Sequence, residues 1–388
     1  MSMGMEVVCI VICVSPLLFT WLSFDSCDCP RRFRCCTMTV DEIRQIAYTS
    51  VLSNAISPCG QYVAFGTTMH RLLVYSISSD LFQSQMESKP HQVLPLDVIS
   101  SWLTLCTARE YLLCGSSADL WCFKWSSGGL LRPVSRRSIP TNTVPMDSTA
   151  ITNLRYQSDM DRLYVSTNSG LVHVYKFDPD LVYLSTINAH KSTIHSLCLA
   201  GSTQFSTCSE DGFVRFWDDR CDQVCSSFRP SDFPSLARPH FGDWLTALAC
   251  DASDSDWFVS GGGPFLSLWN RRACRPMVPL LPDDSPETWY VQTTLFSSAS
   301  GDAQIISGGN SGRLYRWDHS GSLLSSVSLS EPTRSRIGHI LLVDFVEPSY
   351  QDPTLVDIAD GVLVVGGVGP VIRIVSMLGY PLGVLNLR

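Results

Sequence analysis

The residues most suggestive of chemistry lie together in the middle of the chain. His190, Thr207 and Asp211 supply an imidazole, a hydroxyl and a carboxylate within one short stretch. These are the side-chain types of a catalytic triad, in which a base activates a hydroxyl and a carboxylate orients the base. The same types can instead satisfy one another's hydrogen bonds, because a buried donor or acceptor needs a partner. The elements that carry these residues decide between a hydrolytic site and a structural network.

The stretch 189–220 predicts strands and a tight turn around these residues. Apolar and polar residues alternate at 194–198 and 214–216, which indicates strands with one face in a core and the other toward water. Asp211-Gly212 lies between the two runs, and its glycine suits the positive φ of a hairpin turn. A starting His, a turn Asp and the closing pair Trp217-Asp218 make the WD40 signature, which corresponds to one four-stranded propeller blade per repeat.

Weaker copies of this unit recur along most of the chain. The hairpin before the closing residue returns six more times, with spacings of 42 to 58 residues. The seven closing positions are Tyr75, Trp125, Tyr175, Trp217, Trp269, Trp317 and Val375. Only the fourth and fifth copies keep the preceding histidine, as His190 and His240. The sequence therefore predicts an all-β, seven-bladed WD40 β-propeller over residues 38–388, in which every sheet packs on two neighbours.

Within such a blade the His, hydroxyl, Asp and Trp are expected to form a buried polar chain. His190 would bond both Asp211 and Thr207, and the Thr207 oxygen would accept the ring N–H of Trp217. We therefore predict that these four residues form a structural polar network and that the chain is not an enzyme.

Two glycine-rich stretches, 261–264 and 366–370, resemble phosphate-binding loops. Neither is followed by Lys and Ser/Thr, and both lie between predicted strands, so we predict tight turns. The histidines are dispersed and no cluster in the predicted propeller has metal-ligand spacing. The sequence thus predicts no catalytic site, no cofactor, no metal and no small-molecule substrate.

The charge balance argues against a protein whose main work is binding nucleic acid. The formal net charge is −8, and 16% of the residues are charged, whereas nucleic-acid-binding domains are usually strongly basic. Three basic clusters in predicted loops could still make weak or indirect contact with RNA phosphate, although solvated loops are the simpler interpretation. They comprise Arg132, Arg136 and Arg137; Arg271, Arg272 and Arg275; and Arg334 and Arg336. Further surface loops are predicted, from their content of Pro, Ser and charged residues, at 84–94, 130–147, 276–286 and 347–354.

Residues 1–37 form a hydrophobic, cysteine-rich extension before the predicted propeller. Six of the 16 cysteines fall here, and residues 7–24 are nearly continuously apolar. Three interpretations stay open: a membrane anchor, a signal peptide, or an upstream extension outside a working protein that starts at Met38. The other ten cysteines are scattered singly, and several, including Cys114, Cys198 and Cys250, occupy apolar positions. That pattern is typical of reduced core residues rather than of a disulfide framework.

Closure of the ring also leaves alternatives. The C-terminal residues 381–388 could form the outer strand of blade seven. The segment after Met38 could instead add a strand there, or form a helix that caps the ring, because its apolar residues also fit helical spacing.

The closing residues of the fourth repeat, Trp217-Asp218-Asp219-Arg220, match a docking pattern. Some WD40 proteins use W-D-x-R to bind the adaptor of a cullin-type ubiquitin ligase, and Arg220 would then be exposed at the rim of the propeller. An ordinary solvated arginine is the alternative, since the tetrapeptide is common in such repeats. A substrate receptor of a cullin-type ligase is therefore the second function that we carry forward.

A narrower resemblance is carried by the fifth repeat. Arg238-Pro239-His240 is followed by Trp244, and residues 254–269 read DSDWFVSGGGPFLSLW. These stretches resemble the RPH-x-x-x-W and D-S-D-W…GGGP-x-L-x-L-W features that characterise the THO complex subunit 6 family. Residues 57–66, 209–218 and 378–380 are similar as well. The resemblance covers roughly residues 40–388 and does not cover residues 1–37.

This resemblance implies a non-enzymatic scaffold of the nuclear THO/TREX complex, which couples transcription and mRNA processing to mRNA export. The propeller would dock on coiled-coil THO subunits through its exposed loops. Trp244, Asp256 and Arg271 in the best-matched repeat, together with Arg220 on the rim, are the expected exposed contact residues. The expected location is the nucleus, without a membrane partner; a membrane-anchored form is the alternative if residues 7–24 are used.

Overall fold

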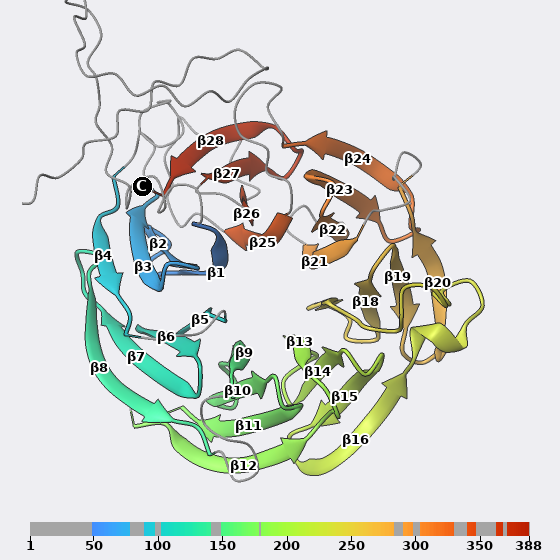
Figure 1. Cartoon of the computed structure of the whole chain (residues 1–388), viewed down its shortest axis with the longest axis horizontal. Coiled ribbons are helices and arrows are strands. Elements are labelled where there is room, and N and C mark those ends of the chain that lie inside the picture. Colours follow the sequence, from blue (N-terminus) through green and yellow to red (C-terminus); the bar gives the residue numbers. More distant parts are fainter. Residues whose placement is uncertain are drawn as a thin grey trace, which may run out of the picture.

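Seven antiparallel sheets are arranged as the blades of a closed ring (Figure 1). The computed structural model describes residues 49–77, 89–97, 102–140, 149–177, 180–282, 290–297, 303–329, 340–346, 362–367 and 371–387. Within these ranges each sheet contains four consecutive strands. The predicted all-β, seven-bladed propeller is therefore confirmed.

Each blade runs from an inner strand to an outer strand. The inner strands, which line the centre of the ring, are β1 (Val51–Ile56), β5 (Thr104–Ala108), β9 (Ile151–Gln157), β13 (Ile194–Leu199), β17 (Ala247–Cys250), β21 (Val291–Ser297) and β25 (Ile340–Val346). The second strands are β2 (Tyr62–Thr67), β6 (Tyr111–Ser116), β10 (Arg162–Thr167), β14 (Gln204–Ser209), β18 (Trp257–Gly262), β22 (Gln304–Gly309) and β26 (Val362–Gly367).

The third strands carry the closing positions of the repeats. They are β3 (Arg71–Ser76), β7 (Asp119–Trp125), β11 (Leu171–Lys176), β15 (Val214–Asp218), β19 (Phe265–Asn270), β23 (Arg313–Asp318) and β27 (Val371–Ser376). The outer strands are β4 (Gln92–Pro95), β8 (Leu131–Ser138), β12 (Val182–Asn188), β16 (Cys221–Phe228), β20 (Arg275–Leu280), β24 (Leu323–Ser328) and β28 (Pro381–Asn386). A short 3-10 turn, η2 (Pro230–Asp232), lies in the connection between blades four and five.

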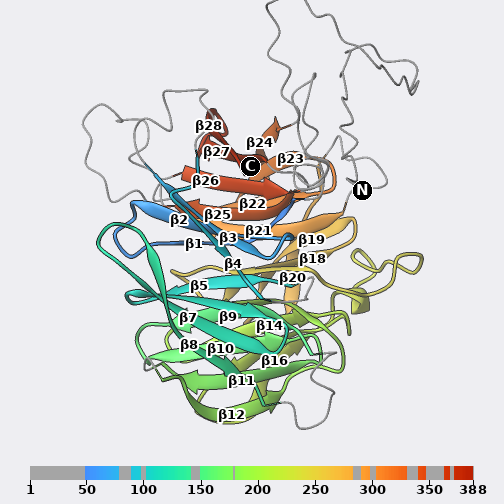
Figure 2. The ribbon, with the colours of Figure 1, turned by 60° about the vertical axis from the view of Figure 1, so that its left-hand side comes forward.

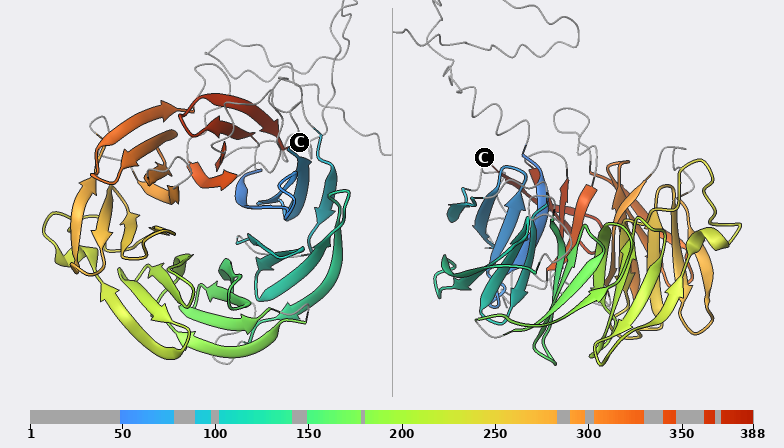
Figure 3. Two further views of the ribbon diagram at one scale, coloured as in Figure 1. Left: turned by 180° about the vertical axis from the view of Figure 1, so that it is seen from behind. Right: turned by 60° about the horizontal axis from the view of Figure 1, so that its bottom comes forward.

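The core lies between neighbouring blades rather than inside any one of them. Seven apolar clusters occupy the seven contacts between adjacent sheets. All seven closing residues are buried, and Trp269 and Val375 are fully so. Side views show the sheets standing face to face around the ring (Figures 2 and 3). A blade therefore buries both of its faces only when both neighbours are present.

The predicted loops need correction in three places. Gln92–Pro95, Leu131–Ser138 and Arg275–Leu280 are outer strands and not loops. An outer strand has one unpaired edge and much of its surface in water, so it tolerates prolines and arginines that obscure the alternating pattern. The predicted loop at 347–354 lies outside the described residues.

The ring closes by packing between blades seven and one. β28 pairs with β27 as the outer strand of blade seven, which confirms the first of the alternatives for closure. Blade one contributes its own four strands, and residues such as Phe65 and Tyr75 pack against Ile372 and Leu385 of blade seven. The boundary between blades seven and one is therefore an apolar contact like those between the other blades.

Residues 1–48 lie outside the described part of the chain, so the hydrophobic extension stays a prediction. No helix among the described residues has the length and hydropathy needed to span a bilayer.

Candidate functional site

The structure brings the four polar residues of blade four into one hydrogen-bonded chain. The Nδ1 atom of His190 lies 2.9 Å from Asp211, and its Nε2 atom lies 2.8 Å from the Thr207 hydroxyl. The Thr207 oxygen also accepts the Trp217 ring N–H at 3.0 Å. These bonds fit a neutral imidazole that donates from Nδ1 to the carboxylate and accepts the Thr207 proton at Nε2. We call His190, Thr207, Asp211 and Trp217 the blade-four network.

Burial and charge favour the neutral His190 and the ionised Asp211. Burial lowers the pKa of His190 more than the hydrogen bond to Asp211 raises it. Burial acts to raise the pKa of Asp211, but the bond from His190 and the positive charge of Arg215 contribute to lowering it to about 2. Arg215 donates to Asp211 at 3.1 Å and to the backbone oxygen of Ala189 at 2.6 Å. Sequence reasoning missed Arg215 as a member of this group. The available signal was its position on a predicted strand, between the apolar residues Val214 and Phe216.

The blade-four network lacks the geometry of a nucleophilic site. The Thr207 hydroxyl is fully buried, and its oxygen lies between the imidazole and the indole. A nucleophile must reach its substrate, and here the positions around the oxygen are taken by the bonding partners. The arrangement can hold the segment before β13 against the hairpin between β14 and β15, which is a structural task.

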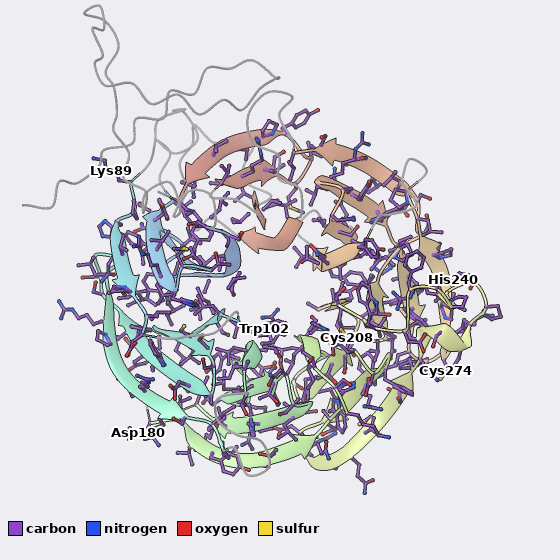
Figure 4. All side chains as sticks on the ribbon, in the orientation of Figure 1. Lys89, Trp102, Asp180, Cys208, His240 and Cys274 are labelled. Atoms are coloured by element: carbon purple, nitrogen blue, oxygen red, sulfur yellow. The ribbon has the colours of Figure 1, made fainter. Side chains whose placement is uncertain are left out.

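Blade five solves the same structural problem with different residues. His240 is exposed and lies toward the outside of the ring (Figure 4), so this histidine does not take the place that His190 has in blade four. Arg238 makes the corresponding connection in blade five. It is buried and donates from Nη1 to the backbone oxygen of Gly262. It also donates from Nη2 to the backbone oxygen of Trp244 at 2.7 Å. One side chain thus joins the segment before β17 to the hairpin between β18 and β19.

The glycines of blade five make room for Arg238. A Cβ atom on Gly263 would lie 2.6 Å from Nη1 of Arg238, and one on Gly262 would lie 2.4 Å from the backbone oxygen of Trp244. Gly263 also has a φ of +57°, which favours glycine. The Gly263-Pro264 turn leaves no position for an aspartate like Asp211. These contacts confirm the predicted tight turn at 261–264; residues 368–370 of the second glycine stretch lie outside the described residues.

Arg220 is exposed, as predicted, with 71% of its side chain accessible. Its guanidinium forms a bidentate pair with Asp218, with Nε to Oδ1 at 2.8 Å and Nη2 to Oδ2 at 2.7 Å. This hydrogen bond and charge lower the pKa of Asp218. The W-D-x-R segment therefore holds its arginine in one orientation, with one edge of the guanidinium already occupied.

Asp256 and Arg271 differ from the expected exposed loop residues. Asp256 is buried, because its carboxylate contacts Arg272 at 2.5 Å and Arg271 at 3.8 Å. Arg271 is half-buried, donates to Gln204 at 2.8 Å and lies over the Phe216 ring. The expectation of exposure was wrong for Asp256, since the neighbouring arginine side chains cover its carboxylate. Arg271 thus connects blade five to blade four, whereas Asp256 contacts arginines of its own blade. The role of both residues in partner binding stays a prediction.

Trp244 lies at the opposite end of β17 from Asp256. Its ring is half-exposed, stacks on Tyr290 with centroids 6.2 Å apart, and has the Arg238 guanidinium 5.4 Å from its centroid. Phe241 contacts the same Tyr290 ring and is 42% exposed. Of the four predicted contact residues, Trp244 therefore sits in an aromatic group at one end of blade five. Arg220 lies in the turn between β15 and β16 of blade four, and Arg271 contacts blade four from blade five.

The basic clusters are largely paired with acidic residues. Arg136 contacts Asp119 at 2.6 Å and lies over the Trp121 ring, and Arg137 lies 3.5 Å from Asp180. These arginines lie on the outer strand β8, which corrects the predicted loop location. Arg334 and Arg336 lie outside the described residues. RNA contact through any of these clusters stays a prediction.

The described residues contain no group of three or more His, Cys, Asp and Glu side chains arranged to hold a metal ion. The Cys-rich part of the extension lies outside them.

The curated proteins to which this chain is similar include THO complex subunit 6 proteins of three animals. The chain is 26% identical to THO complex subunit 6 of Homo sapiens over 294 residues, which is 74% of this chain and 82% of the relative. It is 26% identical to the THO complex subunit 6 homolog of Danio rerio, over 60% of this chain and 72% of that one. The Drosophila melanogaster THO complex subunit 6 is 24% identical over 58% of this chain and 65% of the relative.

The fold comparison agrees with the sheet topology. The crystal structure of the WD40 beta propeller domain of Doa1 superposes with a TM-score of 0.57 at 15% identity, over 85% of this chain and 95% of that one. No protein-family model matches the sequence. The resemblance to the THO complex subunit 6 family that the fifth repeat indicates is confirmed by these curated relatives, whose matches cover 58% to 74% of this chain.

Proposed function

We propose that this chain is a non-enzymatic propeller subunit of a THO complex and works as a scaffold for the other subunits. The observation that carries this proposal is the similarity to THO complex subunit 6 over 82% of the human relative. A rigid ring with loops on two faces and a rim can hold several partners at once. By analogy with the complex named in these relatives, the chain acts in the nucleus and helps couple transcription and mRNA processing to mRNA export.

The working unit in this proposal is the propeller, residues 38–388, and its partners are coiled-coil THO subunits. Trp244 is the contact residue that the structure supports best, because its ring is half-exposed beside the exposed Phe241. Aromatic rings are frequent anchors at protein interfaces. RNA contact in this proposal is weak or indirect, since the net charge is −8 and several arginines pair with carboxylates within the protein.

Affinity purification from cells of the source organism tests this function. We expect the tagged full chain, and a chain beginning at Met38, to co-purify THO subunits before and after ribonuclease treatment. Trp244→Ala should weaken this association, whereas Trp257→Ala, which removes a half-buried ring at the opposite end of β17, should not. A purification of the folded chain that recovers no THO subunit would overturn the proposal.

The second candidate is a substrate receptor of a cullin-type ubiquitin ligase. The observation in its favour is the exposed and oriented Arg220. Binding of a ligase adaptor that is abolished by Arg220→Ala would support it, and adaptor binding that is absent or unchanged would exclude it.

A further inference from the structure

Two cysteines face each other across the boundary between blades four and five. Cys198 is the last residue but one of β13, and Cys250 is the last residue of β17. Their Sγ atoms lie 3.2 Å apart. The hydroxyl of Ser206 lies 3.0 Å from the Cys198 sulfur and 3.1 Å from the Cys250 sulfur. The two inner strands also meet where Ser196 donates to the backbone oxygen of Leu248 at 3.3 Å. Cysteines 52 residues apart in sequence thus form a dithiol.

This pair differs from the cysteines that only fill space. Cys114 and Cys208 are fully buried, and burial raises their pKa values. Cys198 and Cys250 are instead half-buried as residues. They pack at the margin of the apolar cluster between the two blades rather than inside it. Their mutual proximity and the shared Ser206 hydroxyl distinguish this pair from cysteines that only fill space in the core.

The surroundings make the two sulfurs unequal. Burial acts to raise the pKa of Cys198, but hydrogen bonds from Cys250 and Ser206 and the charge of Arg155 lower it overall. The hydrogen bond to Cys198, together with burial, raises the pKa of Cys250 well above its usual value. Cys198 is therefore the cysteine of the pair that loses its proton more readily, and Cys250 is the thiol that donates to it. A thiolate is the nucleophilic form of cysteine.

We propose that Cys198 and Cys250 form a redox-active dithiol that hydrogen peroxide oxidises to a disulfide joining blades four and five. The sulfurs need to approach by only about 1 Å, because a disulfide bond is about 2.05 Å long. The link would connect the inner strands at the end where Arg271 already bonds Gln204 across the same boundary. Reduction by a dithiol restores the two free cysteines.

The reaction proceeds in two balanced steps. The Cys198 thiolate attacks one oxygen of hydrogen peroxide, the O–O bond breaks, and Cys198 sulfenic acid and hydroxide form. The Cys250 sulfur then attacks the Cys198 sulfur, the S–O bond breaks, and the hydroxyl leaves as water with the Cys250 proton. The first hydroxide takes up the proton that Cys198 had lost. Two thiols and one peroxide thus give one disulfide and two waters, with the sulfurs oxidised and the peroxide reduced.

Peptide mapping of the full chain after peroxide treatment tests this site. The reduced protein is exposed to a small excess of hydrogen peroxide, alkylated, and digested without reductant. We expect the Cys198–Cys250 linkage to be the dominant new cross-link, to disappear with dithiothreitol, and to raise the melting temperature by about 5 °C. This measurement on the unaltered chain does not depend on whether a variant folds.

Single substitutions separate the two roles. Cys250→Ser should abolish the cross-link and leave Cys198 as a sulfenic acid that dimedone traps, whereas Cys198→Ser should give at least tenfold less dimedone adduct on Cys250. Cys106→Ser is the matched control, because Cys106 is also half-buried on an inner strand, and it should change neither result.

Three results would overturn the proposal. The first is the absence of a Cys198–Cys250 linkage while other cysteines oxidise. The second is equal dimedone labelling of both single variants. The third is a stoichiometric thiophilic metal ion in the purified protein that is lost in both variants, which would make the pair a metal site instead.

Discussion

Blades four and five perform the same structural task with different chemistry. Blade four joins the segment before its inner strand to its central hairpin through His190 and Asp211. Blade five makes the corresponding connection through Arg238 alone, which bonds two backbone oxygens. The first solution needs a longer turn that carries an aspartate. The second needs a short Gly-Pro turn that leaves space for a guanidinium.

The difference extends to the hydroxyl on the second strand. Thr207 in blade four bonds both His190 and Trp217. Ser260 is its counterpart in blade five, but Trp269 donates to Ser267 at 2.7 Å instead, and the Ser260 hydroxyl has no partner among the described residues. Ser260 and Arg238 both line a small cavity of about 10 Å³. A repeat can therefore keep its shape while the signature residues lose their original partners.

Removal of Arg238 should have the largest effect. Arg238→Met keeps the bulk of the side chain but leaves the carbonyls of Gly262 and Trp244 without their donor. Because hydrogen bonds to charged groups contribute more than neutral ones, we expect a loss of about 3 kcal/mol in the free energy of unfolding, measured with urea. His240→Ala is the control from the same motif and should change stability by less than about 0.5 kcal/mol. Equal effects of the two substitutions would contradict the assignment of Arg238 as the buried link.

The equivalent hydroxyls of the two blades should respond unequally. Thr207→Val removes a donor and an acceptor without a change of shape, and it leaves His190 and Trp217 with unpaired polar atoms. We expect it to cost about 2 kcal/mol, whereas Ser260→Ala should cost less than about 0.5 kcal/mol because no protein bond is lost. Urea unfolding of both variants measures the difference. A cost for Ser260→Ala as large as that for Thr207→Val would show that blade five also depends on this hydroxyl.

The sequence predicts the repeated parts of this molecule better than the irregular ones. The closing residues were correctly placed because an alternating strand pattern and a buried apolar side chain recur in every repeat. Three of the outer strands were mistaken for loops, since residues such as Pro133 and Arg136 face water and follow no apolar alternation. Among the site residues, His190 and its partners follow a known spacing.

Arg238 was missed as a structural residue because its partners are backbone oxygens, which leave no pattern of side chains in the sequence. The absence of an aspartate from the Gly263-Pro264 turn was the available signal. Likewise, the approach of Cys198 to Cys250 depends on the packing of two strands from different blades. No local sequence pattern predicts the distance between two such residues.

Acid should weaken blade four and leave blade five unchanged. The pKa of His190 is lowered in the folded state, so the unfolded chain binds this proton first as the pH falls below about 6.5. The stability that neutral His190 provides is thus present above that pH and is lost on acidification. An arginine does not titrate in this range, so the contribution of Arg238 stays constant.

Comparison of two variants with the wild type isolates the contribution of His190 to the pH dependence of stability. The destabilisation caused by His190→Gln should shrink by up to about 1 kcal/mol between pH 7.5 and pH 5.5, whereas that caused by Arg238→Met should not change. Urea unfolding at several pH values gives both numbers. Buried His173, whose pKa is lowered to about 4 by burial, is present in all three proteins and cancels. A constant effect of His190→Gln across this range would show that His190 is not held neutral.

The smallest effect on stability is expected at the rim, where the two blades meet solvent. Arg220 has most of its side chain in water, and its pairing with Asp218 is screened there. Arg220→Ala should therefore leave the melting temperature unchanged, in contrast to every substitution in the buried links. A clear fall in melting temperature would place Arg220 among the residues that hold the blades together. An unchanged value would leave its orientation by Asp218 available for partner binding, so that any loss of a partner by this variant can be assigned to the contact itself.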